Sequence, residues 1–167
     1  MKSSILINKN CPICETNKYS KIIYKANLEN NINAMNYSGR KKPDGLHYEM
    51  VRCMNCSLLY ASQVYEDIIT EKLYTESSFG YKAELKGLKK TYGNCLLEGE
   101  KTIKNKENFL EIGCGNGFVL ELTQNTGWQN IMGIEPSLKS IENSNPDVIS
   151  KIFNGIFNAD NYQNNFF

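Results

Sequence analysis

Long apolar runs are absent from this 167-residue sequence, and so is an excess of charge of either sign. No stretch approaches the roughly 20 apolar residues that a membrane-spanning helix needs, and Ile5–Ile7 is too short for the core of a signal peptide. Lys and Arg together number 19 and Asp and Glu 18, so the net charge of +1 argues against a strongly basic nucleic-acid-binding protein. We therefore expect a cytoplasmic protein without a membrane or nucleic-acid partner.

Histidine is also scarce, since His47 is the only one, but there are six cysteines. Four of them form two C-x-x-C pairs, Cys11 with Cys14 and Cys53 with Cys56. In a reducing cytoplasm such pairs are more often metal ligands than disulfides, because two turns of this kind can complete a tetrahedral zinc site. We predict a closed, structural Zn²⁺ site on these four cysteines, with His47 outside it. A redox pair and a chance spacing are the alternatives.

The insertion between the two cysteine pairs, residues 15–52, is longer than in a minimal zinc ribbon and must carry strands of its own. We predict strands at Ile22–Tyr24, His47–Val51 and Leu58–Tyr60. Residues 1–63 are thus expected to form a small zinc-ribbon-like β domain, because a segment of this size cannot bury enough core to fold without a metal.

Residues 64–104 are predicted to form a helical linker, with helices at Glu66–Thr75 and Lys82–Lys104. Apolar residues recur along the second helix at three- and four-residue spacing, which indicates one buried stripe. We expect Cys95, beside this stripe, to be a small buried residue. The interspersed Lys and Glu residues favour a solvated helix surface over a phosphate-binding face.

A strand, a glycine loop and a helix follow one another in residues 105–167. Asn108–Ile112 has the pattern of a buried parallel strand, the loop Gly113–Gly117 comes next, and a helix begins at Phe118. Such glycines let the backbone approach a ligand closely, and the helix N-terminus offers free N–H groups. The next predicted strand, Ile131–Ile134, ends at Glu135, an acid placed to accept hydrogen bonds from ribose hydroxyls.

We predict one further strand within residues 151–157. The alternative interpretation of the glycine loop is a tight turn that binds no ligand. The loop differs from the NAD-type G-x-G-x-x-G pattern, whose third glycine would fall at Phe118. This shift argues against a dehydrogenase.

The segment Leu110–Gly117 resembles motif I of class I S-adenosylmethionine-dependent methyltransferases, and Gly133–Ser137 resembles their second-strand motif. The resemblance implies S-adenosylmethionine as cofactor. It further implies that Glu135 holds the ribose hydroxyls, that Glu111 orders the amino-group side, and that the methionine part is wrapped by Gly113, Gly115 and Gly117. The acid that many members place near the adenine is absent from Gly155-Ile156-Phe157, so apolar packing or Asp160 would serve there.

The N-terminal part is similar to a zinc-binding domain that precedes some methyltransferases, including sugar C-methyltransferases that act on nucleotide-linked deoxysugars. This similarity implies a small-molecule acceptor. Tyr81 is the nearest match to a tyrosine that faces the active site in that branch, and ordinary aromatic packing is the alternative.

The predicted fold class is α/β: the small zinc-ribbon-like domain, linking helices, and an incomplete Rossmann-like (doubly wound) methyltransferase domain in 105–167. That domain has about 60 residues, where well over a hundred are usual. The strand Phe109–Ile112 would then expose a bare edge, open to a complementing chain or a second copy.

We thus expect the N-terminal part of a methyltransferase, with little or no turnover by this chain alone. No general base is identifiable, so its catalytic residues are unassigned. The alternatives are an RNA methyltransferase whose zinc ribbon holds RNA, and a non-catalytic zinc-stabilised fragment or interaction module.

Overall fold

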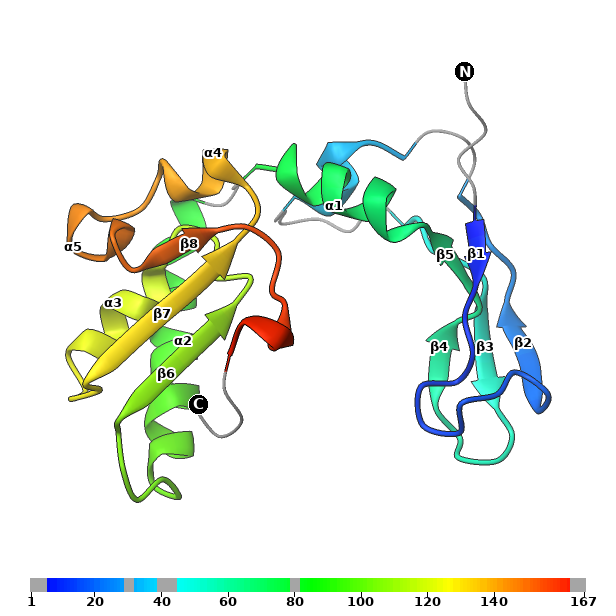
Figure 1. Ribbon diagram of the computed structural model, residues 1–167, viewed down its shortest axis with the longest axis horizontal. Coiled ribbons are helices and arrows are strands. Elements are labelled where there is room, and N and C mark those ends of the chain that lie inside the picture. The colour runs from blue at the N-terminus through cyan, green and yellow to red at the C-terminus, as the bar shows by residue number, and fades with distance from the viewer. Residues whose placement is uncertain (1–5, 29–31, 39–44, 79–81, 163–167) are drawn as a thin grey trace.

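The structure, a computed structural model, describes residues 6–28, 32–38, 45–78 and 82–162. It is a mixed α/β protein. Two small antiparallel sheets form one end and a three-stranded parallel sheet with its helices forms the other (Figure 1). The helix α1 (Asp67–Thr75) and the short 3-10 helix η1 (Ala34–Tyr37) lie between these ends and pack against each other.

The N-terminal end contains a two-stranded and a three-stranded sheet, both antiparallel. One sheet pairs β1 (Leu6–Asn8) with β5 (Gln63–Tyr65). The other contains β2 (Ser20–Tyr24), β3 (Met50–Cys53) and β4 (Leu59–Ala61), with β3 in the middle. A small buried cluster of Cys11, Val51, Cys53 and Tyr60 forms the core of this end.

The middle strand begins later than the sequence predicted, at Met50 rather than at His47. The reason is that Asn27 takes over the pairing there. Its backbone N–H donates to the carbonyl of His47 at 3.2 Å, and its side chain accepts from the N–H of His47 at 2.7 Å. The side-chain amide thus replaces a regular strand ladder over this stretch.

The linker contains the two predicted helices, but α2 is shorter than expected, Leu85–Glu100, and follows the 3-10 turn η2 (Lys82–Glu84). The face of α2 nearest α3 includes Gly93, where an added Cβ would lie 3.7 Å from Leu122. The prediction that Cys95 is buried is wrong, because Cys95 is exposed. A helix that packs on one neighbour buries only a narrow strip, and Cys95 lies outside it.

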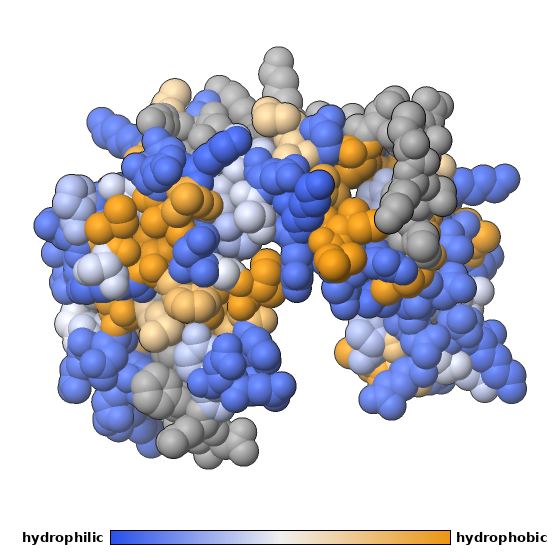
Figure 2. All heavy atoms as spheres, turned by 45° about the horizontal axis from the view of Figure 1, so that its top comes forward, coloured by the Kyte–Doolittle hydropathy of each residue, from blue (hydrophilic) through white to orange (hydrophobic). Residues whose placement is uncertain are grey.

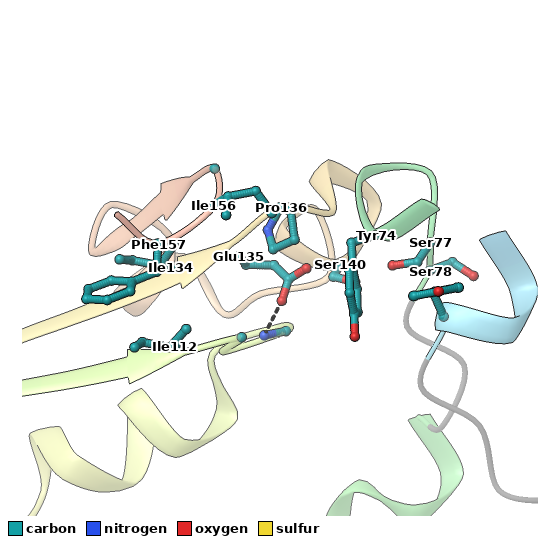
Figure 3. Close-up of a pocket in the computed structure, with 14 residues that line it drawn as sticks. Tyr74, Ser77, Ser78, Ile112, Ile134, Glu135, Pro136, Ser140, Ile156 and Phe157 are labelled. Atoms are coloured by element: carbon teal, nitrogen blue, oxygen red, sulfur yellow. Dashed lines mark hydrogen bonds between the residues drawn. The ribbon is translucent and has the colours of Figure 1, made fainter. Parts of the chain in front are cut away.

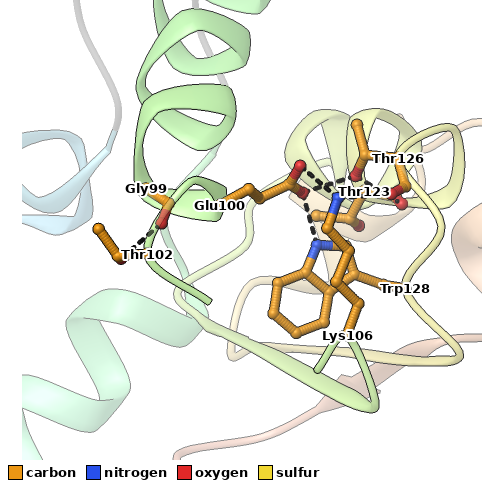
Figure 4. A network of polar contacts seen from close by, with 7 residues as sticks. All are labelled: Gly99, Glu100, Thr102, Lys106, Thr123, Thr126 and Trp128. Atoms are coloured by element: carbon orange, nitrogen blue, oxygen red, sulfur yellow. Dashed lines mark hydrogen bonds and ion pairs between the residues drawn. The ribbon is translucent and has the colours of Figure 1, made fainter. Parts of the chain in front are cut away.

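The C-terminal end of α2 is fastened by a buried carboxylate (Figure 4). The Glu100 side chain, 7% exposed, accepts from Lys106 Nζ at 2.6 Å. It also accepts from the Thr126 hydroxyl at 2.8 Å and from Trp128 Nε1 at 2.7 Å. Burial alone would raise the pKa of Glu100, but these three donors lower it below its ordinary value. The sequence suggested only a solvated helix surface here.

The parallel sheet has the strand order β6–β7–β8, from β6 (Asn108–Ile112), β7 (Asn130–Glu135) and β8 (Ile152–Asn154). All three strands were predicted. The helix α3 (Phe118–Gln124) joins the first two, while α4 (Leu138–Ile141) and α5 (Pro146–Ile149) lie between the second and third. This order is compatible with a Rossmann-like part.

The two faces of the parallel sheet differ in burial. Phe109, Ile131 and Ile152 share one face and pack against the core of Cys114, Leu120 and Val148. On the other face the central Ile134 is buried, but its neighbours Ile112 and Phe153 are 58% and 57% exposed. Figure 2 shows that apolar side chains gather on the visible surface of both ends of the molecule.

Gly133 is required at the centre of β7 because the glycine loop packs directly over it. A Cβ at this position would lie 2.5 Å from Cys114 Sγ and 2.7 Å from Leu120 Cδ1. We expect Gly133→Ala to lower the free energy of unfolding by about 1–3 kcal/mol, as overpacking of a core does. Chemical denaturation measures this effect.

The matched control is Gly87→Ala in α2, where an added Cβ meets nothing within 4 Å. It should be neutral or stabilise by up to about 1 kcal/mol, because alanine favours the helix. Equal stability of the two variants would contradict the packing of the loop on β7.

Candidate functional site

The four predicted cysteines meet at one point in the N-terminal end of the molecule. Cys11 Sγ lies 3.5 Å from Cys56 Sγ, Cys14 Sγ lies 3.8 Å from Cys53 Sγ, and all four sulfurs are within 4.8 Å of one another. A tetrahedral centre with metal–sulfur bonds of about 2.3 Å requires sulfurs about 3.8 Å apart. The cluster can therefore hold a metal ion, as predicted, and His47 is not part of it.

Two copies of the same turn deliver these thiols. In each copy the residue after the second cysteine has a left-handed backbone, with φ of 55° at Glu15 and 66° at Ser57. Its N–H donates to the carbonyl of the first cysteine, at 2.7 Å for Glu15 to Cys11 and at 2.8 Å for Ser57 to Cys53. Asn55 Nδ2 adds a donor at 3.2 Å from Cys14 Sγ.

The backbone of the turns also controls the charge of the thiols. The N–H of Cys56 favours the Cys53 thiolate and lowers the pKa of Cys53 to about 7. The N–H of Leu58 favours the Cys56 thiolate, but burial and the neighbouring thiols raise the pKa of Cys56 to about 12. In the metal-free cluster the Cys53 thiol therefore ionises more readily than the Cys56 thiol.

A second candidate site lies at the carboxyl ends of the parallel strands, where the glycine loop joins β6 to α3. Gly113, Gly115 and Gly117 all have left-handed φ, of 76°, 56° and 69°. At Gly117 a Cβ would also lie 2.9 Å from Ile152 Cδ1. The loop turns back over the sheet because the N–H groups of Gly113 and Cys114 both donate to the carbonyl of Ile134.

Glu135 fastens this loop to the end of β7. The residue is only 8% exposed. Its Oε2 accepts from the N–H of Gly115 at 2.9 Å, and its Oε1 accepts from the N–H of Ser137 at 2.8 Å. The sequence placed Glu135 at the strand end, but the hydrogen bond to the loop was not foreseen. A carboxylate oxygen has two lone pairs, so each can still accept from a ligand hydroxyl.

Glu111 is a partly buried residue near the end of β6, just before the loop. Its Oε2 is buried and has no hydrogen-bond partner among the described residues. Burial, and then the Glu135 carboxylate, raises the pKa of Glu111 to about 8. The same causes, with Glu111, raise the pKa of the Cys114 thiol to about 12, so this cysteine is no nucleophile at neutral pH.

A cavity of about 400 Å³ opens at the end of the sheet, within the roughly 300–1,000 Å³ of small-molecule sites. Figure 3 shows Glu135 in its middle, with an apolar end formed by Ile112, Ile134, Ile156 and Phe157. Tyr74, Ser77 and Ser78 form the opposite end. Tyr37, which also lines the cavity, contacts the Tyr74 ring. Among the described residues that line the cavity, Glu135 alone has a charged side chain.

The structure brings only some of the predicted ligand residues to this cavity. Gly113, Gly115 and Glu135 line it, whereas Glu111, Gly117 and Asp160 are not among its described lining residues. Tyr81 lies outside the described residues. The sequence did not predict that Tyr37 and Tyr74 would line the cavity. No local sequence pattern indicates that η1, which contains Tyr37, lies near the end of β7.

In comparisons with known proteins, no protein-family model matches the chain and no curated protein matches it. Among the described residues, no helix is both long and apolar enough to cross a membrane.

Replacing Glu111 with glutamine should change how stability depends on pH. Its raised pKa means that unfolding lets the carboxyl ionise, so its contribution to stability falls as the pH rises from about 4.5 to about 8. Relative to the native chain, Glu111→Gln should gain about 1–4 kcal/mol between pH 5 and pH 8. Urea unfolding at both pH values measures this gain. A pH profile of Glu111→Gln that runs parallel to that of the native chain would contradict the raised pKa.

Proposed function

We propose that the cavity binds S-adenosylmethionine and that the chain serves methyl transfer to a small-molecule acceptor, with Zn²⁺ on the four cysteines as a structural ion. One observation carries the proposal. A loop of three left-handed glycines is fastened to an acid at the end of the neighbouring parallel strand, and both face a cavity of small-molecule size. Ligands of open α/β sheets bind in this place.

The charge of the cavity favours this cofactor over a dinucleotide. A pyrophosphate carries negative charge and needs cationic or N–H partners near it. Here Glu135 is the only charged side chain among the described lining residues, and one loop amide, that of Gly115, already donates to it. A sulfonium and an ammonium group are cations, which a carboxylate attracts. The site therefore suits S-adenosylmethionine better than NAD.

The residues of the cavity match the parts of this cofactor. The apolar end, with Ile156 and Phe157, would take the adenine, in agreement with the lack of an acid at Gly155–Phe157. Glu135 would accept from the ribose hydroxyls, and Gly113 and Gly115 would let the methionine part approach the backbone. When bound, the cofactor supplies an electrophilic methyl group on sulfur.

The residues at the cavity offer little acid–base chemistry. Glu135 is engaged by two backbone donors. Burial, and then the hydroxyl of Tyr48, raises the pKa of Tyr37 well above its ordinary value, so Tyr37 stays protonated. Positioning of the reactants is then the main contribution to methyl transfer. We propose that the isolated chain binds the cofactor but turns over little or not at all.

Calorimetric titration of the zinc-loaded chain tests the cofactor. We expect saturable binding of S-adenosylmethionine and S-adenosylhomocysteine, and none of NAD. Gly115→Asp should abolish binding, because it places a second carboxylate and a side chain in a left-handed position beside Glu135. Gly87→Asp, on the exposed face of α2, is the control and should bind normally. A folded, zinc-loaded chain that binds neither ligand would refute the proposal.

A further inference from the structure

We propose that the metal on the four cysteines and the ligand in the cavity bind cooperatively. The reason is that the insertion between the two cysteine pairs, residues 15–52, also contributes a residue to the cavity. This inference rests on the proposed function of the cavity. It assigns a second role to a metal site that lies at the far end of the N-terminal sheets, away from the cavity.

The insertion between Cys14 and Cys53 contains η1, whose Tyr37 lines the cavity. Its stem is the β2–β3 ladder, in which Ser20 pairs with Cys53 and Lys21 with Arg52. The metal closes the base of this ladder, so that loss of the metal frees the two ends of the insertion. Closing a loop lowers the entropy of its open state and thereby favours the ordered one.

A short chain of contacts leads from the metal site to the cavity wall. β3 ends at Cys53, and Tyr48 lies just before this strand begins. The Tyr48 hydroxyl is hydrogen-bonded to the Tyr37 hydroxyl at 2.7 Å. The Tyr37 ring in turn meets the Tyr74 ring edge to face, with 4.8 Å between centroids, and both rings line the cavity.

The residue after η1 ties the insertion to the segment that follows α1. The Oγ of Ser38 accepts from the N–H of Ser78 at 2.9 Å. The neighbouring carbonyl of Ser77 accepts from the Ser137 hydroxyl at 2.6 Å, and the N–H of Ser137 donates to Glu135. Ser38 and Ser137 are both buried. The position of η1 is therefore linked to the carboxylate at the centre of the cavity.

The element with two states is η1 with Ser38, which either packs on Tyr74 and Ser78 or is released from them. Metal and ligand both favour the packed state, so each must raise the affinity of the other by the same factor. We expect this factor to be about fivefold or more, within the usual range of coupling between sites.

Two titrations measure the factor from both sides. Zinc affinity is measured by competition with a chromogenic chelator, with and without saturating S-adenosylhomocysteine. The affinity for S-adenosylhomocysteine is measured by calorimetry with zinc-loaded and metal-stripped chain. The expected result is an increase of zinc affinity by the ligand. The zinc titration remains valid even if the metal-stripped chain unfolds.

Variants of the link then localise the coupling. Tyr37→Phe removes the hydrogen bond to Tyr48 but keeps the ring, and Ser38→Ala removes the acceptor for Ser78. In the double variant the factor should shrink toward one while zinc still binds. Ser62→Ala is the matched control, because it removes a serine hydroxyl bonded to Glu49 in the same end of the molecule but outside this cavity. It should keep the full factor.

The outcomes separate this inference from the proposed function. If the zinc-loaded chain binds S-adenosylhomocysteine but zinc affinity is the same with and without it, the coupling is refuted and the cofactor site stands. A double variant with the native factor would likewise refute the route through η1. If a folded, zinc-loaded chain binds no cofactor, the proposed function falls and the inference falls with it.

Discussion

Removal of the metal, or Cys11→Ser, should unfold the N-terminal sheets while the parallel sheet with its helices stays folded. The buried cluster beside the metal site contains four of the described residues, and two of them are cysteines of the site. So small a core cannot offset the conformational entropy of folding. Structural zinc sites contribute about 10–16 kcal/mol of apparent binding free energy in small domains, and this energy is folding energy.

Circular dichroism and thermal unfolding with and without a chelator measure this loss, which zinc should reverse. Cys95→Ser is the matched control, because Cys95 is exposed and outside the cluster. It should keep both the metal and the native melting curve. An N-terminal end that stays folded after chelation would show that the four sulfurs are not a structural metal site.

Glu100→Ala should lower the free energy of unfolding by about 3–5 kcal/mol, the cost of removing one partner from a buried ion pair. The substitution leaves Lys106 without its carboxylate and Trp128 without its acceptor, while the Thr126 hydroxyl keeps only the carbonyl of Thr123. A donor that is left without an acceptor in the folded chain destabilises it, because the same donor is hydrogen-bonded to water in the unfolded chain. Urea denaturation measures the change.

The pH dependence of the same pair has a definite sign. The pKa of Glu100 is lowered below its ordinary value of 4.5, so its contribution is fully present above that value and is lost as the pH falls through the folded-state pKa. Glu98→Ala is the control, since Glu98 makes an exposed contact with Lys101 that contributes about 0–1 kcal/mol. Similar losses in both variants would contradict the role of Glu100.

Local chemistry made much of the fold predictable from sequence. The two C-x-x-C turns place their thiols by covalent spacing, so the cluster followed from four residues alone. Likewise β6 was predicted with its observed bounds, because a short apolar run that ends at a glycine is typical of a buried strand. Both signals are contained within a few neighbouring residues.

Features that depend on distant packing were not predictable in this way. Glu100 looks like other helix-surface acids, and its burial depends on residues beyond the helix, among them Thr126 and Trp128. Tyr37 gave no sign that it would line a cavity with Glu135, because η1 reaches that place through tertiary contacts. The prediction for Cys95 was wrong because the apolar pattern of a helix does not show which part of its surface will pack on a neighbouring element.

The repeated turn of the cysteine pairs has a consequence for protein engineering. Glu15 and Ser57 have left-handed backbones, although neither is a glycine. Such a conformation costs an ordinary L-residue about 1–2 kcal/mol, and glycine escapes that cost. These two positions, which supply no metal ligand, are therefore where the design of a more heat-resistant form of this protein would begin.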